Sequence, residues 1–161
     1  VDPVADELPS GNYHRSEILV RQFAVAVPDL SDVAVSADSG GQWSPLGTGS
    51  PVVGLRPSPA HVTSPEGIAF VYFETYCLTP GTPYMTTVQL EPTDGGGDTY
   101  DLSFPGDAPL EPGPRVGRTL RLDLSDSEPG SYRMLLTVRD ETTGERTLPF
   151  ETEVIVRGTR D

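Results

Sequence analysis

The chain has 161 residues, of which 24 are Asp or Glu and 11 are Arg; it contains no Lys, and its formal net charge at pH 7 is −13. A surface this acidic repels phosphate backbones and anionic headgroups, which argues against a nucleic-acid-binding protein and against docking on an anionic membrane. The 17 Gly and 17 Pro residues are more than a helical protein usually contains, and they are ordinary for a protein of short strands joined by turns.

The absence of Lys is explained equally well by codon bias and by adaptation to high salt, where self-repulsion is screened. The sequence leaves both explanations open.

The polar residues 1–15 contain two prolines, which predicts a linker or a loosely attached arm. We expect a single domain over residues 16–161. Residues 37–50 are expected to form a loop that carries the only tryptophan, Trp43. The strands predicted before residue 60 lie at 16–27, 30–36 and 52–55.

The longest run of strand-favouring residues is 67–78, GIAFVYFETYCL. Alternate positions on both faces are apolar, which predicts the central strand of a sandwich, covered on one face and at least partly on the other. The turn signals at 79–83 predict a return into a second strand at 84–91, so that the two strands form a hairpin.

The rest of the chain alternates apolar and polar residues between Gly- and Pro-rich turns. Its predicted strands lie at 99–104, 116–124, 131–140 and 148–156. Short strands at this spacing, without helical periodicity, predict an all-β protein. We expect an immunoglobulin- or fibronectin-III-like antiparallel β-sandwich of about eight to nine strands.

Three segments resemble the C-terminal β-sandwich region of GWxTD domain-containing bacterial proteins: YFETYCL (72–78), PGSYRMLLTVRDETTGE (129–145) and FETEVIV (150–156). The LSD at 30–32 resembles a short upstream strand of that family. The family's Tyr-x-Glu-x-Tyr strand, and its Gly-x-Tyr-x-Leu strand ending in Asp, match Tyr72, Glu74, Tyr76, Gly130, Tyr132, Leu135 (displaced by one residue) and Asp140.

The chain departs from that family in two ways. The Gly-Trp-x-Thr-Asp signature is absent, and Cys77 stands where the family often has Asn. The resemblance implies an extracytoplasmic parent protein, periplasmic, secreted or lipid-anchored, of largely unknown function.

Glu74 lies in the middle of the predicted central strand, on the same face as Tyr72 and Tyr76. A buried carboxylate needs a partner, and we expect an arginine such as Arg133 or Arg139. One interpretation is a general acid flanked by aromatics, as in a glycoside hydrolase. Because no second carboxylate is placed beside Glu74 by spacing, we favour a structural role for all three side chains and predict that the protein is not an enzyme.

Two acidic loops contain candidate calcium ligands, namely Asp94, Asp98, Asp123 and Asp126. Neither loop matches the twelve-residue calcium-binding pattern, so solvated acidic loops are the simpler interpretation and calcium is the alternative. His14, His61 and Cys77 have no zinc spacing, and we predict no cofactor. Cys77 is interpreted as an inert buried thiol.

Tyr132 follows Pro-Gly at the start of an alternating strand. That position predicts a tyrosine corner, in which the hydroxyl bonds to nearby backbone.

These features predict a non-catalytic interaction or accessory module of a larger bacterial extracytoplasmic protein. Its partner would be another protein or a neighbouring domain of the same polypeptide, with no nucleic acid and no insertion of this segment into a membrane. Loops at 37–50, 92–98 and 105–115 would supply recognition. The alternative, a carbohydrate-binding module with or without calcium, needs a surface row of aromatics, for which the candidates are Trp43, Tyr84 and Tyr100.

Overall fold

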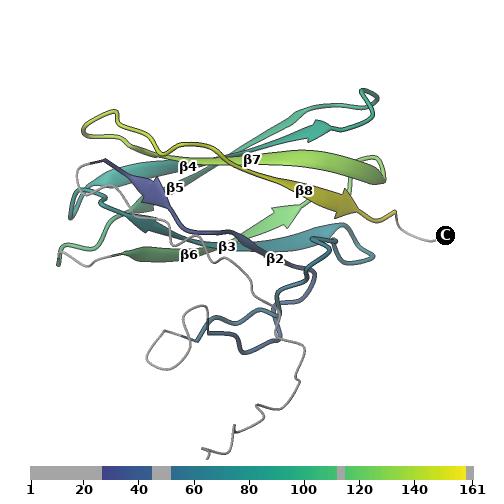
Figure 1. Cartoon of the computed structure of the whole chain (residues 1–161), viewed down its shortest axis with the longest axis horizontal. Coiled ribbons are helices and arrows are strands. Elements are labelled where there is room, and N and C mark those ends of the chain that lie inside the picture. Colours follow the sequence, from purple (N-terminus) through teal and green to yellow (C-terminus); the bar gives the residue numbers. More distant parts are fainter. Residues whose placement is uncertain (1–26, 45–51, 112–114, 159–161) are drawn as a thin grey trace, which may run out of the picture.

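The computed structural model describes residues 27–44, 52–111 and 115–158. These residues form two antiparallel sheets packed face to face, and they contain no helix (Figure 1). The predicted all-β sandwich is therefore confirmed. The predicted linker at 1–15 and nearly all of the predicted strand at 16–27 lie outside the described residues.

The first sheet is built around β3 (Ile68–Tyr76). β1 (Asp29–Leu30) and β2 (Ala34–Ser36) pair antiparallel with β3, as does β6 (Val116–Asp123). Because β6 follows nearly the whole length of β3, the two short strands share the opposite edge. β3 is thus the central strand, as the sequence predicts.

The predicted strand at 30–36 is split into β1 and β2. Between them, the side chain of Ser31 takes the place of a backbone carbonyl in the pairing with β3. Its hydroxyl oxygen accepts a hydrogen bond from the Glu74 backbone N–H at 2.9 Å. The Ser31 backbone N–H in turn donates to the Glu74 carbonyl at 2.9 Å. The interruption therefore holds the chain beside the middle of β3.

The second sheet has the order β5-β4-β7-β8, with every neighbouring pair antiparallel. Its strands are β4 (Pro83–Pro92), β5 (Tyr100–Asp107), β7 (Gly130–Asp140) and β8 (Phe150–Val156). All four begin within two residues of their predicted positions.

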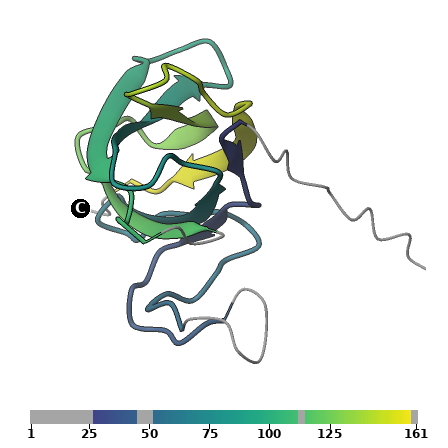
Figure 2. The same ribbon diagram turned by 90° about the vertical axis from the view of Figure 1, so that its left-hand side faces the viewer.

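The predicted hairpin between β3 and β4 is wrong. The two strands lie in different sheets, and residues 77–82 carry the chain across the edge of the sandwich (Figure 2). Cys77 has a φ of 59°, which turns the chain immediately after β3. Turn signals show where a strand ends but not whether the next strand pairs with it. Here the apolar faces of β3 and β4 are buried in one core between the sheets.

The core lies between the two sheets and contains the inward-facing residues that alternation predicts for β6, β7 and β8. Its buried members from these strands are Leu120, Leu122, Tyr132, Met134, Leu136, Val138, Val154 and Val156. β3 contributes Ala69, Val71 and Phe73 from the same alternation.

Between β2 and β3, the described residues 37–44 and 52–60 leave the sandwich and stand out beyond the first sheet (Figures 1 and 2). We refer to the described parts of this segment, 37–44 and 52–60, as the arm. The predicted strand at 52–55 is reduced to a single bridge, in which Trp43 and Val53 exchange backbone hydrogen bonds of 3.0 and 2.7 Å. Val53 and Leu55 pack on Tyr72, so the arm covers part of the second face of β3.

Most sheet edges are covered by neighbouring backbone or blocked by side chains. Segment 61–63 lies alongside β8, and the Ile155 N–H donates to the His61 carbonyl at 3.0 Å. The Ser58 N–H donates to the Val35 carbonyl of β2 at 2.8 Å. On β5, Pro105 has no N–H, and Arg118 donates to its carbonyl at 2.6 Å.

The outer edge of β6 has no backbone partner among the described residues, and it carries the exposed charges Arg121 and Asp123.

Candidate functional site

A buried carboxylate lies on the outer face of β3, where alternation places Tyr72, Glu74 and Tyr76 side by side. The Tyr72 hydroxyl donates to Glu74 Oε1 at 2.9 Å, and the Tyr76 hydroxyl donates to Oε2 at 2.8 Å. Only 2% of Glu74 is exposed. The three side chains that the sequence places on one face therefore form one hydrogen-bonded cluster.

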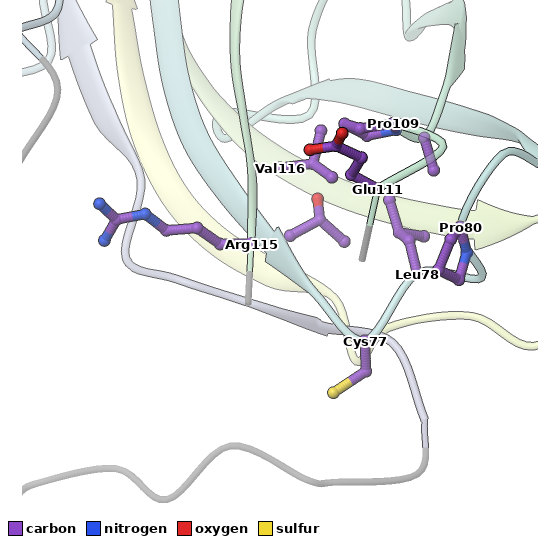
Figure 3. Close-up of a pocket in the computed structure, with 9 residues that line it drawn as sticks. Cys77, Leu78, Pro80, Pro109, Glu111, Arg115 and Val116 are labelled. Atoms are coloured by element: carbon purple, nitrogen blue, oxygen red, sulfur yellow. The ribbon is translucent and has the colours of Figure 1, made fainter. Parts of the chain in front are cut away.

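Arg115, immediately before β6, is the cationic partner of Glu74. Its Nε lies 3.4 Å from Glu74 Oε1. Arg115 also lines a small pocket at the end of β3, with a volume of about 20 Å³. Figure 3 shows that the Arg115 side chain extends away from the carboxylate of Glu111, another residue of this pocket. That volume is about enough for a single water molecule.

The predicted ion pair of Glu74 with Arg133 or Arg139 is wrong. Both arginines lie on β7 of the other sheet, where Arg133 binds Glu91 and Arg139 binds Glu141. Strand alternation identifies which residues share a face, but it does not identify which strand pairs beside them. The partner of Glu74 follows from the pairing of β3 with β6.

Gly117 lies opposite Glu74 in the pairing of β3 with β6. A Cβ atom on Gly117 would lie 2.9 Å from the Tyr72 hydroxyl oxygen. The missing side chain therefore makes room for the hydroxyl that donates to Glu74. A glycine inside an alternating strand often marks a place where another group approaches the backbone closely. This signal at Gly117 could have added the residue to the predicted site.

The electrostatics of the cluster keep both tyrosines protonated. Burial, together with the hydrogen bond to Glu74 and the charge of that carboxylate, raises the pKa of Tyr72 to about 12. The same causes, burial first, raise the pKa of Tyr76 to about 12. Since each Glu74 oxygen already accepts a tyrosine hydroxyl, the arrangement is suited to fixing a carboxylate and poorly suited to transferring its proton to a substrate.

A surface hollow of about 360 Å³ lies beside this cluster, between the arm and β6. It is lined by Val52, Val53, Gly54, Tyr72, Gly117, Arg118 and Thr119. The ring of Trp43 packs edge-on against Tyr72, with the ring centres 5.7 Å apart. The cluster on β3 thus supports the base of the arm.

Tyr132 makes the hydrogen bond expected of a tyrosine corner. Its hydroxyl donates to the backbone carbonyl of Glu128 at 2.8 Å. Burial, together with the negative charge of nearby groups, raises the pKa of Tyr132. The bond ties the connection after β6 to the start of β7.

The four candidate calcium ligands are not gathered into a metal site. Asp94 accepts a hydrogen bond from the Gly96 backbone, and Asp123 binds Arg121 and Ser125. Within residues 27–44, 52–111 and 115–158, no three His, Cys, Asp or Glu side chains are placed to share a metal ion. The calcium alternative, which also includes Asp98 and Asp126, therefore gains no support from the geometry.

The three candidate sugar-stacking aromatics lie apart. Trp43 is on the arm, whereas Tyr84 is buried in the core beneath the guanidinium of Arg118, 5.4 Å from the ring centre. Tyr100 packs against Tyr132, with ring centres 6.1 Å apart. They do not form the surface row that the carbohydrate-binding alternative needs.

The interpretation of Cys77 as a buried thiol is wrong, because its side chain is exposed. Alternation alone places Cys77 with the inward residues of the strand, but β3 ends at Tyr76. His61 Nδ1 lies 2.9 Å from the Thr152 hydroxyl oxygen, beside β8. His14 falls outside the described residues.

Asp140 is a buried carboxylate that reasoning from residue chemistry missed. It accepts backbone hydrogen bonds from Thr79, Thr142 and Thr143 at 3.1, 2.8 and 3.1 Å. Burial alone would raise its pKa, but these hydrogen bonds outweigh burial and lower it. The only sequence signal is its place in the resembling segment, at the end of a strand.

The amino-acid sequence matches no protein-family model and no curated protein. The resemblance to the GWxTD-associated sandwich therefore stays a prediction. In the described part of the chain there is no helix long and apolar enough to span a bilayer.

Proposed function

We propose that this chain is a non-catalytic recognition module, an immunoglobulin-like sandwich within a larger extracytoplasmic bacterial protein. The observation that carries the proposal is the state of Glu74, the strongest candidate for acid–base chemistry. Its carboxylate is buried, hydrogen-bonded through both oxygens and neutralised by Arg115. A catalytic acid must reach its substrate, and this side chain supports its own fold instead.

Two features support the immunoglobulin-like assignment and the predicted family. The connection from β6 to β7 crosses between the sheets, and Tyr132 forms its corner bond near the start of β7, as in immunoglobulin-like sandwiches. The left-handed backbone at Cys77 is one that Asn tolerates better than most residues, which suits the family's frequent Asn at this position.

The arm is the element that we propose for recognition. Its base is fixed by contacts of Val53 and Leu55 with Tyr72, whereas Val52 is 64% exposed beside the hollow above β6. An exposed aliphatic side chain on an anchored projection suits apolar contact with a protein partner or a neighbouring domain.

The proposal is tested with a photo-crosslinking amino acid at position 52 and a control at Gly96, an exposed residue on a loop of the second sheet. Both variants are exposed to the envelope fraction of the producing bacterium. We expect one discrete protein adduct from position 52, lost when Leu55→Ala loosens the base of the arm, and no such adduct from position 96. Equal capture from both positions, or capture that survives loosening, would contradict recognition by the arm.

A separate measurement addresses catalysis. Because the carboxylate is structural, Glu74→Gln should lower the stability of the protein and should not change its rate of hydrolysis of any substrate. Hydrolysis of a panel of glycosides and esters by the native protein, lost in Glu74→Gln at a temperature where the variant stays folded, would overturn the non-catalytic assignment.

A further inference from the structure

The outer face of the second sheet carries a row of hydroxyl groups. Thr87 of β4 lies opposite Ser103 of β5 on one side and opposite Thr137 of β7 on the other. One row further along, Met85 lies opposite Arg139. The backbone of Arg139 forms an isolated antiparallel β-bridge with Arg146, on the far side of the loop after β7. Three neighbouring strands thus place hydroxyls beside two guanidinium groups.

These six side chains line a surface hollow of about 290 Å³. None of the lining residues is acidic, although 24 of the 161 residues of the chain are Asp or Glu. The charged side chains among these six are therefore both cationic, in a protein whose net charge is negative.

The two arginines differ in how they are occupied. Arg139 holds Glu141 through Nε and Nη2, at 2.9 and 3.1 Å. Arg146 is exposed and has no ion-pair partner among the described residues. Its guanidinium is thus the principal group available for an anionic ligand.

The chemistry of the hollow indicates its ligand class. A guanidinium binds a carboxylate through two parallel hydrogen bonds, and Ser and Thr hydroxyls both donate and accept. A ligand that uses both features carries one carboxylate and several hydroxyls. A polyanion would be repelled by the rest of the molecule, whose net charge is −13.

We propose that this hollow binds a single uronic acid residue, with the carboxylate on Arg146 and the ring hydroxyls along Ser103, Thr87 and Thr137. This site is independent of the arm, which lies over the first sheet. It also needs no aromatic platform, unlike the carbohydrate-binding mode predicted from the sequence. Because the hollow is shallow, we expect weak, rapidly exchanging binding.

The test is an NMR titration of the ¹⁵N-labelled protein with glucuronate, glucose, acetate and inorganic phosphate at constant ionic strength and pH. Glucuronate should shift the amides around Thr87, Ser103 and Thr137 saturably. Arg146→Gln should weaken that binding about tenfold, as expected for loss of a charge-assisted pair. Arg121→Gln, which removes an exposed arginine from the first sheet, is the matched control and should leave the affinity unchanged.

Thr87→Val removes the central hydroxyl while keeping a β-branched side chain, and it should weaken glucuronate binding without changing the response to acetate. Acetate or phosphate shifting the same amides with the affinity of glucuronate would overturn the sugar assignment. An affinity unaffected by Arg146→Gln, or the absence of any saturable shift, would overturn the site. None of these outcomes depends on whether the arm captures a protein.

Discussion

A buried carboxylate needs hydrogen-bond donors, and Glu74 obtains two from tyrosines placed two residues before and two residues after it on the same strand. The Tyr-x-Glu-x-Tyr spacing alone predicts that the three side chains share a face. It does not predict Arg115, because that partner depends on how β3 and β6 are paired. The sequence therefore predicts that the two tyrosines lie beside the carboxylate, but it does not predict which arginine pairs with it.

The raised pKa values of Tyr72 and Tyr76 predict a loss of stability at alkaline pH. In the unfolded chain these hydroxyls ionise near pH 10, whereas in the folded protein they hold their protons to about pH 12. The folded state therefore binds more protons between these values. The stabilisation is complete below pH 10 and is lost as the pH rises toward 12.

Urea unfolding at pH values between 8 and 11.5 measures this effect. Tyr76→Phe should destabilise the protein by about 1–3 kcal/mol at pH 8, because it leaves one buried carboxylate oxygen without its donor. It should also reduce the alkaline decline. Tyr100→Phe, which removes a hydroxyl remote from Glu74, is the control; an equal alkaline decline in wild type and Tyr76→Phe would contradict the assignment.

At the scale of elements, alternation and turn residues predict where most strands lie, but not which strands pair. The strands from β4 to β8 have clear period-two patterns bounded by Gly and Pro. The turn after β3 carries the same signals as a hairpin turn, yet it crosses between sheets. Pairing is decided by burial of both strands in one core, which is a property of the whole sandwich.

The approach of β6 to the outer face of β3 depends on Gly117. Gly117→Ala should displace the Tyr72 hydroxyl from Glu74 and destabilise the protein by about 1–3 kcal/mol, the usual range for overpacking. Thermal or chemical unfolding measures the change. Gly130→Ala is the matched control, because a Cβ there meets nothing within 4 Å. Equal effects of the two substitutions would contradict the steric argument.

Asp140 joins two turns, since it accepts N–H groups from Thr79 after β3 and from the loop after β7. Its pKa is lowered in the folded state, so its contribution to stability is present above the ordinary value of 3.8 and is lost as the pH falls below it. Asp140→Asn should cost about 2 kcal/mol near neutral pH and flatten the acid side of the stability profile. An unchanged profile in acid titration would show that these hydrogen bonds carry no charge-dependent stability.

At the scale of the whole molecule, self-repulsion from the net charge of −13 opposes folding. We expect the melting temperature to rise with NaCl, because salt screens exposed charges. Calcium chloride at matched ionic strength should give no further rise beyond that of magnesium chloride. A calcium-specific rise, abolished by EDTA, would instead indicate a metal bound to the native state and would direct attention to Asp94, Asp98, Asp123 and Asp126.

The edges of the two sheets are poorly suited to pairing with a second molecule in concentrated solution. β8 and β2 are partnered by neighbouring backbone, β5 contains Pro105, which has no N–H to donate, and β6 presents charged side chains. Such edges give a second molecule little opportunity to extend the sheet in register. Fibrillar aggregation should therefore proceed through the unfolded chain. Variants that lower stability should aggregate in proportion to their unfolded population, while the native protein stays monodisperse.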